Sequence, residues 1–473
     1  MSARPAPRHS LVRFFFVLLC LFGTATAAFA TEKPDLVRLY AHSADNPDQP
    51  PVILIHGLMG ATLVDSKTGK QVWPGGVTAL TFSDYRNLIE MPAADRNGEG
   101  LVPGELFTNF AGVDFYSALI KSLETVGRFE RGVPGEKVGP QRRRYYVFLY
   151  DWRKDNVESV RQLHALIEQI RSDYQDPKLR VDIIAHSNGG LIANYYLRYG
   201  PRDVLDDATF KPWNEGHERI RRVVMLGTPA LGSVRSVERL LYGMRIGLRT
   251  IPVEVMASLA TPFEALPHPD VRPIVDRNGK PVDIDIYDPA TWQARHWSVY
   301  SPEVIARVRA TGATPAEGDA AIAKLQALFV THLRRAKSFQ LALTGPLPAR
   351  DVDVAVFGGD CKMTAARGLL VEDGNGGRVV FRPNETGPGR IGEPGKKPTK
   401  AERLDYEALL ADPGDGLVTR DSQVGRDPAN RLAMPLDFHR LPVMQTFFLC
   451  ESHETLTSNT YFQNNLLYFL LSR

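Results

Sequence analysis

Short apolar runs that end in turn residues recur along this chain and restrict its fold more than any other feature. The runs lie at residues 51–55, 145–149, 181–185, 223–226, 352–357 and 446–449. Unbroken apolar runs of this length are typical of strands buried on both faces of a parallel sheet. Helical spacing lies between them, most clearly at Val160, Leu163, Ile167 and Ile170. The alternation predicts an α/β fold, with a mostly parallel central sheet, helices on both faces, and loops at the strand C-termini available for chemistry.

Two long stretches interrupt this alternation. Residues 65–112 follow the first strong strand and contain the sequence V-W-P-G-G at 72–76. Residues 233–340 separate two expected strands and contain a helix-like segment at 240–248. They also carry an amphipathic pattern at Ile322, Leu325, Phe329, Leu333 and Ala336. We interpret this second stretch as a cap over the site.

The segments therefore predict four units. They are a leader at 1–30, a first part of the core at 31–232 with the insertion 65–112, a cap at 233–340, and a second part of the core at 341–473. Within the last unit, residues 373–402 are rich in Gly, Pro and charge, and we expect an exposed loop there.

The sequence V-D-I-I-A-H-S-N-G-G-L at residues 181–191 places Ser187 between an expected strand and an expected helix. Ala185 and Gly189 flank the serine at two residues' distance, and small residues there let strand and helix approach closely. The following helix N-terminus favours developing negative charge. This is the pattern of a nucleophile elbow, so we predict Ser187 as the nucleophile. A buried serine at a helix start is the alternative.

A second motif, H-G-x-x-G, follows the strand at 51–55 and begins at His56. Glycines allow a backbone N–H to turn toward a reacting carbonyl group. We predict that the oxyanion-hole donors are the backbone N–H groups of Leu58 and of Asn188, the residue after the serine. His56 is expected to order this loop, and a role as the catalytic base is its alternative.

The general base is expected late in the chain, because α/β-hydrolases place serine, acid and histidine in that order. His453 directly follows a late strand and precedes a helix-like tail at 456–471. His332 lies on the amphipathic cap pattern, where packing explains it. His439, in a basic turn flanked by proline, is an alternative base. We predict His453.

The orienting acid is predicted to be Asp415, which lies between two glycines in the sequence G-D-G-L-V-T. Its carboxylate would accept a hydrogen bond from the imidazole and fix its tautomer, so that the other ring nitrogen can take the serine proton. Asp360, which directly follows an expected strand, is the rival acid.

The first 30 residues have the features of a secretory signal. A leader with three arginines precedes an apolar run at 14–22, and the sequence A-F-A at 28–30 matches a cleavage site. The apolar run is too short to span a bilayer comfortably. We predict cleavage near Ala30 and export, to the periplasm or out of the cell. A lipoprotein signal at Cys20 is the alternative, although Leu19 stands where a small residue is needed.

Charge and cysteine content bear on partners. Loss of the three leader arginines lowers the basic count from 57 to 54, which equals the acidic count of 54. A neutral chain gives no case for a nucleic-acid partner. No metal-ligand spacing or phosphate-binding glycine loop is present in the sequence, so we expect no metal or cofactor.

Cys361 and Cys450 remain after export, and each follows an expected strand. An even pair in an exported protein, on strands expected to be neighbours, predicts one disulfide. Two buried free thiols are the alternative.

On these residues, the chain resembles the lecithin:cholesterol acyltransferase-like family of α/β-hydrolases. That family includes lysosomal phospholipases and phospholipid:diacylglycerol acyltransferases. The likeness covers most of the mature chain and rests on 51–60, 72–75, 112–123, Y-D-W-R at 150–153, 185–190, L-G-T-P at 226–229, 414–418 and the region of His453. The resemblance implies the α/β-hydrolase fold, with Ser187, Asp415 and His453 as the triad. The chain departs from the family at Leu58 and at 229–233, where P-A-L-G-S replaces P-W-G-G-S.

The predicted reaction is acyl transfer from a lipid ester through an acyl-enzyme on serine. Water as acceptor gives hydrolysis, and a lipid alcohol gives O-acyltransfer; the sequence leaves this choice and the oligomeric state open. The exposed face of the cap offers a surface for contact with a membrane or lipid particle. The alternatives are an esterase for non-lipid substrates and a non-catalytic lipid-binding protein on a hydrolase scaffold.

Overall fold

The computed structural model describes most of the chain from residue 33 onward. The described ranges are 33–43, 49–76, 83–90, 100–110, 112–139, 143–206, 209–347, 352–374, 376–382, 400–426 and 443–472. The leader predicted at residues 1–30 and much of the exposed loop predicted at 373–402 lie outside them. Within these ranges, no helix combines the length and the apolar character needed to cross a membrane.

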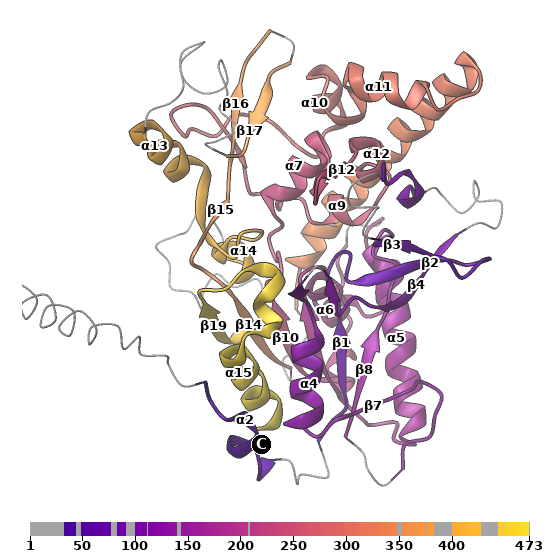
Figure 1. The fold of residues 1–473 in the computed structure, drawn as a ribbon, viewed down its shortest axis with the longest axis vertical. Helices are drawn as coiled ribbons and strands as arrows, with labels where there is room; N and C mark the ends of the chain where they lie inside the picture. Colours follow the sequence, from indigo (N-terminus) through magenta and orange to yellow (C-terminus); the bar gives the residue numbers. More distant parts are fainter. Residues whose placement is uncertain are drawn as a thin grey trace, which may run out of the picture.

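A seven-stranded sheet forms the centre of the molecule (Figure 1). Its strands, from one edge to the other, are β19 (Val443–Leu449), β14 (Asp353–Gly359), β10 (Ile220–Leu226), β9 (Val181–His186), β1 (Val52–Ile55), β8 (Arg144–Phe148) and β7 (Glu130–Arg131). All neighbouring strands run parallel. This confirms the predicted α/β fold, and six of the strands coincide with the predicted apolar runs. The exception, β7, consists of two exposed charged residues and carries no apolar signal.

Alternate residues of each central strand enter different cores, because side chains alternate across a sheet. Ile53 and Ile55 pack in one core, with α5 (Asn156–Asp173) and α6 (Asn188–Tyr199). Val52 and Leu54 pack in the other, with α4 (Ser117–Thr125) and α15 (Thr460–Leu471). Both faces of the sheet are therefore covered by helices.

The order of the strands fixes where a site can form. The chain runs from β1 to β8 on one side and then returns past β1 to β9 and β10. Ligands of open parallel sheets bind outside the strand C-termini at such a reversal. Because β1 ends at Ile55 and β9 at His186, residues 56–60 and Ser187 lie at this point.

The predicted cap folds around an apolar core of its own. Its elements are α7 (Val234–Tyr242), β11 (Met244–Ile246), β12 (Arg249–Ile251), α8 (Val253–Met256), α9 (Thr261–Glu264), β13 (Ile274–Val275), α10 (Pro289–Ala294), η5 (Ser298–Tyr300), α11 (Pro302–Arg309) and α12 (Pro315–Leu343). The predicted amphipathic pattern lies on α12, where Phe329, Leu333 and Ala336 are buried. Figure 1 shows these elements gathered beyond one end of the central sheet.

Two details of the cap differ from the sequence prediction. The helix expected over 240–248 ends at Tyr242, because Gly243 has a φ of 79° and the chain turns there into the hairpin β11–β12. The cap also extends beyond 233–340. Strand β16 (Gly368–Val371) pairs with β13, and β17 (Arg378–Val380) pairs with β16, so an apolar hairpin from the second part of the core completes its sheet.

A small antiparallel sheet follows the loop after β1, and most of it belongs to the stretch predicted as the insertion 65–112. Its strands are β2 (Ala61–Asp65), β3 (Gln71–Trp73) and β4 (Leu101–Leu106). The remaining short elements are α2 (Leu36–Leu39), η2 (Arg86–Leu88), β5 (Asn109–Phe110), β6 (Val113–Asp114), η4 (Gly216–Glu218), β15 (Lys362–Ala365), α13 (Lys400–Leu410), β18 (Ala411–Gly414), α14 (Arg420–Gln423) and η8 (His453–Ser458).

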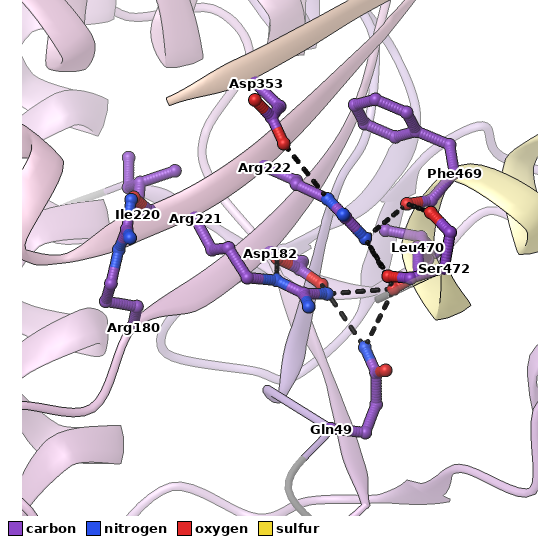
Figure 2. A network of polar contacts seen from close by, with 10 residues as sticks. All are labelled: Gln49, Arg180, Asp182, Ile220, Arg221, Arg222, Asp353, Phe469, Leu470 and Ser472. Carbon is purple, nitrogen blue, oxygen red and sulfur yellow. Dashed lines mark hydrogen bonds and ion pairs between the residues drawn. The ribbon is translucent and has the colours of Figure 1, made fainter. Parts of the chain in front are cut away.

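A polar network anchors the last helix, α15, to the opposite end of the sheet (Figure 2). The Arg222 guanidinium donates to the carbonyl oxygens of Phe469 and Ser472 at 2.6 and 2.7 Å. Arg221 donates to Leu470 O at 2.8 Å and pairs with the buried carboxylate of Asp182. Cations at a helix C-terminus donate hydrogen bonds to its free carbonyl oxygens and interact favourably with the negative end of its dipole. The network holds α15, and with it the preceding segment η8.

Candidate active site

Ser187 occupies the sharp turn between β9 and α6. Its backbone has φ 53° and ψ −119°, a conformation that non-glycine residues rarely adopt. The serine N–H donates to Leu226 O at 2.8 Å, which pins the turn to strand β10. The turn projects the side chain away from the sheet, at the start of a helix.

Close packing around this turn explains its glycines. A Cβ on Gly57 would lie 2.9 Å from the Cβ of Ser187, and a Cβ on Gly189 would lie 2.7 Å from His56 O. A Cβ on Gly190 would collide with the side chain of Thr228. Side chains at these positions would push α6 away from the sheet and displace the serine.

The three predicted triad residues meet at this point. Ser187 Oγ lies 3.0 Å from His453 Nε2, and His453 Nδ1 lies 2.8 Å from Asp415 Oδ2. His453 begins η8, which follows β19, and Asp415 follows β18. All three side chains are buried. The arrangement is a continuous chain from hydroxyl to imidazole to carboxylate.

Backbone groups orient Asp415. Its Oδ1 accepts the N–H groups of Leu417 and Val418 at 2.9 and 2.7 Å, which leaves Oδ2 for the histidine. The His453 N–H in turn donates to Asp415 O at 3.0 Å. A Cβ on Gly227 would lie 3.1 Å from both Asp415 Oδ2 and His453 Nδ1. The acid and the base are therefore held together by main chain as well as by their own contact.

Burial alone would lower the pKa of His453, because it disfavours the charged imidazolium. The carboxylate of Asp415 outweighs this effect through its charge and its hydrogen bond, so the pKa of His453 is raised above the usual 6.5. Glu454 raises the pKa further, and the positive charge of Arg239 opposes it. A base tuned in this way is well suited to accept a proton near neutral pH.

The rival residues lie elsewhere. Asp360 is 3.4 Å from Arg420 in an ion pair and takes no part in the contact with His453. His56 stacks on Tyr150 at 4.2 Å, and burial lowers its pKa to about 4. His332 is packed against Phe263 in the cap. The other alternative base, His439, lies outside the described residues.

The loop after β1 presents the expected oxyanion donors. Leu58 and Asn188 line the same cavity as Ser187, and within the described residues neither backbone N–H donates a hydrogen bond. The loop is closed by the Gly60 N–H, which donates to Gly57 O at 3.0 Å. The N–H of Gly57 itself is occupied, because it donates to the Tyr116 hydroxyl at 2.9 Å. Leu58 and Asn188 thus offer two free N–H groups near the serine.

Tyr116 is a positioning residue that sequence reasoning missed. Its hydroxyl lies 2.8 Å from His186 Nδ1, and His186 Nε2 lies 3.2 Å from His453 O. Burial lowers the pKa of His186 to about 3, so this ring is neutral. A neutral ring with its proton on Nε2 donates to His453 O and accepts from Tyr116, which itself accepts from Gly57. The relay joins the oxyanion loop to the base. Residues 112–123 carry part of the family resemblance, but no pattern within them singles out Tyr116.

A second network lies beneath Asn188. Its side-chain amide exchanges hydrogen bonds with Asn156 at 2.8 and 3.1 Å and donates to the Tyr150 hydroxyl at 3.0 Å. Tyr150 donates to His56 O at 3.0 Å. Tyr150 belongs to the Y-D-W-R segment, whose Trp152 also makes a buried hydrogen bond, from Nε1 to Ala61 O at 3.0 Å. These contacts support the serine from below without facing the cavity.

The cavity in front of Ser187 has a volume of about 360 Å³. Residues of the first part of the core supply a mainly apolar wall that includes Leu58, Met59, Trp73, Phe107 and Phe115. The cap supplies the facing wall, with residues of α7 and β11. The site therefore lies between core and cap, as expected for a cap over the strand C-termini.

Cys361 and Cys450 form a disulfide beside the site. Cys361 precedes β15, which pairs with β18 immediately before Asp415. Cys450 lies three residues before His453. The bridge therefore ties together the two segments that carry the acid and the base.

We expect that the double variant Cys361→Ser with Cys450→Ser is destabilised by about 2–4 kcal/mol, since the bridge closes a loop with a sequence separation of 89. Urea denaturation of oxidised and reduced wild type and of the variant measures this difference. Reduction should shift the wild-type midpoint to that of the variant and leave the variant unchanged. Equal midpoints for oxidised and reduced wild type would contradict this expectation.

Comparisons with known proteins agree with the fold and in part with the resemblance. A family model described as lecithin:cholesterol acyltransferase matches residues 135–271, a stretch that contains β9, Ser187 and α6. A chain from the crystal structure of the Tle4-Tli4 complex is similar with a TM-score of 0.55 and 16% sequence identity, over 89% of this chain and 98% of that chain. This likeness, with the parallel sheet, establishes the α/β-hydrolase fold. No curated protein matches this chain by sequence.

Proposed function

We propose that this protein is a serine-dependent enzyme that transfers the acyl group of lipid esters. The observation that carries the proposal is the contact of Ser187 Oγ with His453 Nε2 at 3.0 Å, in line with Asp415 at 2.8 Å. The apolar wall of the adjoining cavity and the match to an acyltransferase family model support a lipid acyl group as substrate.

In the first step, Ser187 Oγ attacks the ester carbonyl while its proton passes to His453 Nε2. The carbonyl oxygen becomes an oxyanion that the N–H groups of Leu58 and Asn188 stabilise. Collapse breaks the bond to the alcohol, which takes the proton from His453, and leaves an acyl-enzyme. An acceptor hydroxyl then gives its proton to His453 and attacks the acyl carbonyl. The bond from the acyl group to Ser187 Oγ breaks, and Oγ takes the proton from His453, which restores the serine.

The acceptor defines two versions of this activity. Water gives a lipase or phospholipase, and a lipid alcohol gives an O-acyltransferase. The acyltransferase version is favoured by the family match over residues 135–271, which includes the serine turn. Both versions share the acyl-enzyme and the same three side chains.

We further infer that the enzyme works outside the cytoplasm and at a lipid surface. The signal-like leader and the Cys361–Cys450 disulfide support export. Leu248 is 75% exposed at the turn of the β11–β12 hairpin, and Tyr242 is 48% exposed at the end of α7. Because β11 also lines the cavity, these apolar side chains lie on the part of the cap that a lipid surface would meet.

The test is a series of acyl esters of increasing chain length. We expect kcat/KM to rise by as much as about fourfold per added methylene while the chain fills the cavity, because each buried CH₂ contributes about 0.8 kcal/mol. A preference for acetyl esters over long-chain esters would instead indicate an esterase for non-lipid substrates. Product analysis with a phospholipid and a diglyceride or sterol acceptor separates the two versions. Free fatty acid as the only product would exclude the acyltransferase.

A further inference from the structure

One face of α7 presents polar groups to the cavity beside Ser187. Ser233, Ser236 and Arg239 are spaced three residues apart on and before this helix, and all three line the cavity. The Ser233 hydroxyl is occupied, because it donates to Leu417 O at 2.7 Å. In the part of the chain that the structure describes, nothing takes a hydrogen bond from the Ser236 hydroxyl or the Arg239 guanidinium, so both remain for another partner.

Arg239 is half-buried, and its guanidinium has no ion-pair partner among the described residues. Within the described part of the chain, no carboxylate lies at ion-pair distance from its guanidinium, and no acceptor takes a hydrogen bond from it. The neighbouring Arg235 is paired with Glu238 at 2.5 Å, and Glu238 also holds Arg382 at 2.9 Å. Burial lowers the pKa of Arg239 to about 10, so it is charged at neutral pH. Charges removed from water normally have a partner, and this one faces a cavity.

The charges near Arg239 favour an anion as that partner. Arg245 lines the same cavity from β11, and toward the described residues its guanidinium makes one hydrogen bond, from Nε to Gly247 O at 3.3 Å. The carboxylate of Glu454 also lines the cavity; it is exposed to water, and its negative charge acts on both His453 and Arg239. Glu238 and Arg235 also act on Arg239, with opposite signs, and they are paired with each other. The two cations and one exposed carboxylate of the cavity wall therefore leave a net positive charge on the cap side.

The core-side wall offers one placement of a substrate relative to this positive charge, although Met244 and Ile246 make part of the cap side apolar too. The side chains of Leu58, Met59, Trp73, Phe107 and Phe115 offer an acyl chain an apolar surface on the core side. An ester whose acyl chain lies on that wall, with its carbonyl at Ser187, directs its alcohol portion toward the cap. The polar face of α7 is therefore positioned to bind the alcohol portion of the ester.

We propose that Arg239, with the hydroxyl of Ser236, forms a subsite that binds an anionic group, a phosphodiester or a carboxylate, on the alcohol portion of the acyl ester. The subsite rests on the proposed function, since it selects among substrates of the same serine. Arg239 acts on binding and on the choice of substrate, while the triad carries out the chemistry. Charge-assisted hydrogen bonds from a guanidinium to such a group are among the stronger polar contacts in proteins.

The test measures binding in the Ser187→Ala variant, so that it does not depend on turnover. The probes are dihexyl glyceryl ethers with a phosphodiester head, with a carboxylate head, or with an uncharged alcohol head. We expect at least one charged probe to bind roughly 10- to 100-fold more tightly than the uncharged probe. Whichever charged probe binds more tightly shows whether the subsite takes a phosphodiester or a carboxylate. Adding Arg239→Gln should remove this preference and leave binding of the uncharged probe within about twofold. Arg239→Lys should keep part of it.

Arg249→Gln in the same background is the matched control, because it removes one positive charge from β12 of the cap, outside the cavity lining, and breaks no ion pair among the described residues; it should keep the full preference. Equal binding of all three probes, or a preference that survives Arg239→Gln, would overturn the subsite. Failure of the proposed function looks different: the wild-type protein would cleave no ester and would not react with a fluorophosphonate, whatever the probes show.

Discussion

The Ser187→Ala variant is expected to lose covalent labelling by a fluorophosphonate and to show a kcat for long-chain esters about 10⁵- to 10⁶-fold below that of the wild type. The reason is geometric. The hydroxyl at 187 is the group that His453 Nε2 meets at 3.0 Å, and it lies beside the free N–H groups of Leu58 and Asn188. Without it no acyl-enzyme can form. Labelling followed by intact mass, together with single-substrate kinetics, measures both effects.

The control is Ser452→Ala, which removes a hydroxyl directly beside His453 that takes no part in the chain from Ser187 to Asp415. We expect this variant to label at the wild-type rate. Thermal melts of both variants should match the wild type closely, because alanine fits the φ of 53° at position 187 about as well as serine does. If Ser187→Ala still labels, another residue is the nucleophile and the proposed function is wrong.

Replacing Asp415 by asparagine should lower kcat about 10⁴-fold while leaving the protein folded. In the wild type, the Asp415 carboxylate accepts a hydrogen bond from His453 Nδ1 at 2.8 Å, so that Nε2 faces the serine as an acceptor. An amide at 415 can turn its NH₂ group toward Nδ1 and stabilise the wrong tautomer. The matched variant is Asp360→Asn, which disrupts the ion pair with Arg420 at the surface and should change kcat by less than about twofold. A larger loss for Asp360→Asn than for Asp415→Asn would reverse the assignment.

The pH dependence offers a second readout of Asp415. The base must be neutral, so kcat/KM should fall as the pH drops through the pKa of His453. That pKa is raised above 6.5 mainly because the charge of Asp415 outweighs the effect of burial. Neutralising Asp415 removes the charge that raises the pKa, so the acidic limb of the profile should move to lower pH. If the residual activity of Asp415→Asn has its acidic limb at the same pH as the wild type, a group other than His453 controls that limb.

Several features of this molecule were open to prediction from the sequence. The apolar runs marked the positions of six sheet strands, because a strand that is buried on both faces needs apolar residues at nearly every position. The turn at 185–189 marked Ser187, because small residues around a serine at a strand–helix junction are typical of a nucleophile elbow. The positions of Asp415 and His453 followed from the order expected for this fold, with Asp360, His56 and His439 left as rivals.

Other features depended on contacts that have no local signal. Tyr116 reaches His186 from another part of the chain, and Arg239 became notable only when the structure showed that its charge has no partner in the described residues. The hairpin of β16 and β17 joins the cap although it follows the cap in the chain. Each of these facts concerns which side chains meet, and a linear pattern does not encode that.

The sequence by itself therefore determined the strands, the serine turn and a short set of candidate acids and bases. Burial requires apolar residues along a strand, and the strained serine turn requires small residues beside it, so both can be recognised locally. Only the tertiary structure decided which carboxylate faces which imidazole, and which cation is left facing the cavity. Those outcomes depend on distances of a few ångströms between segments that are remote in the chain, and on charges whose partners are chosen by packing.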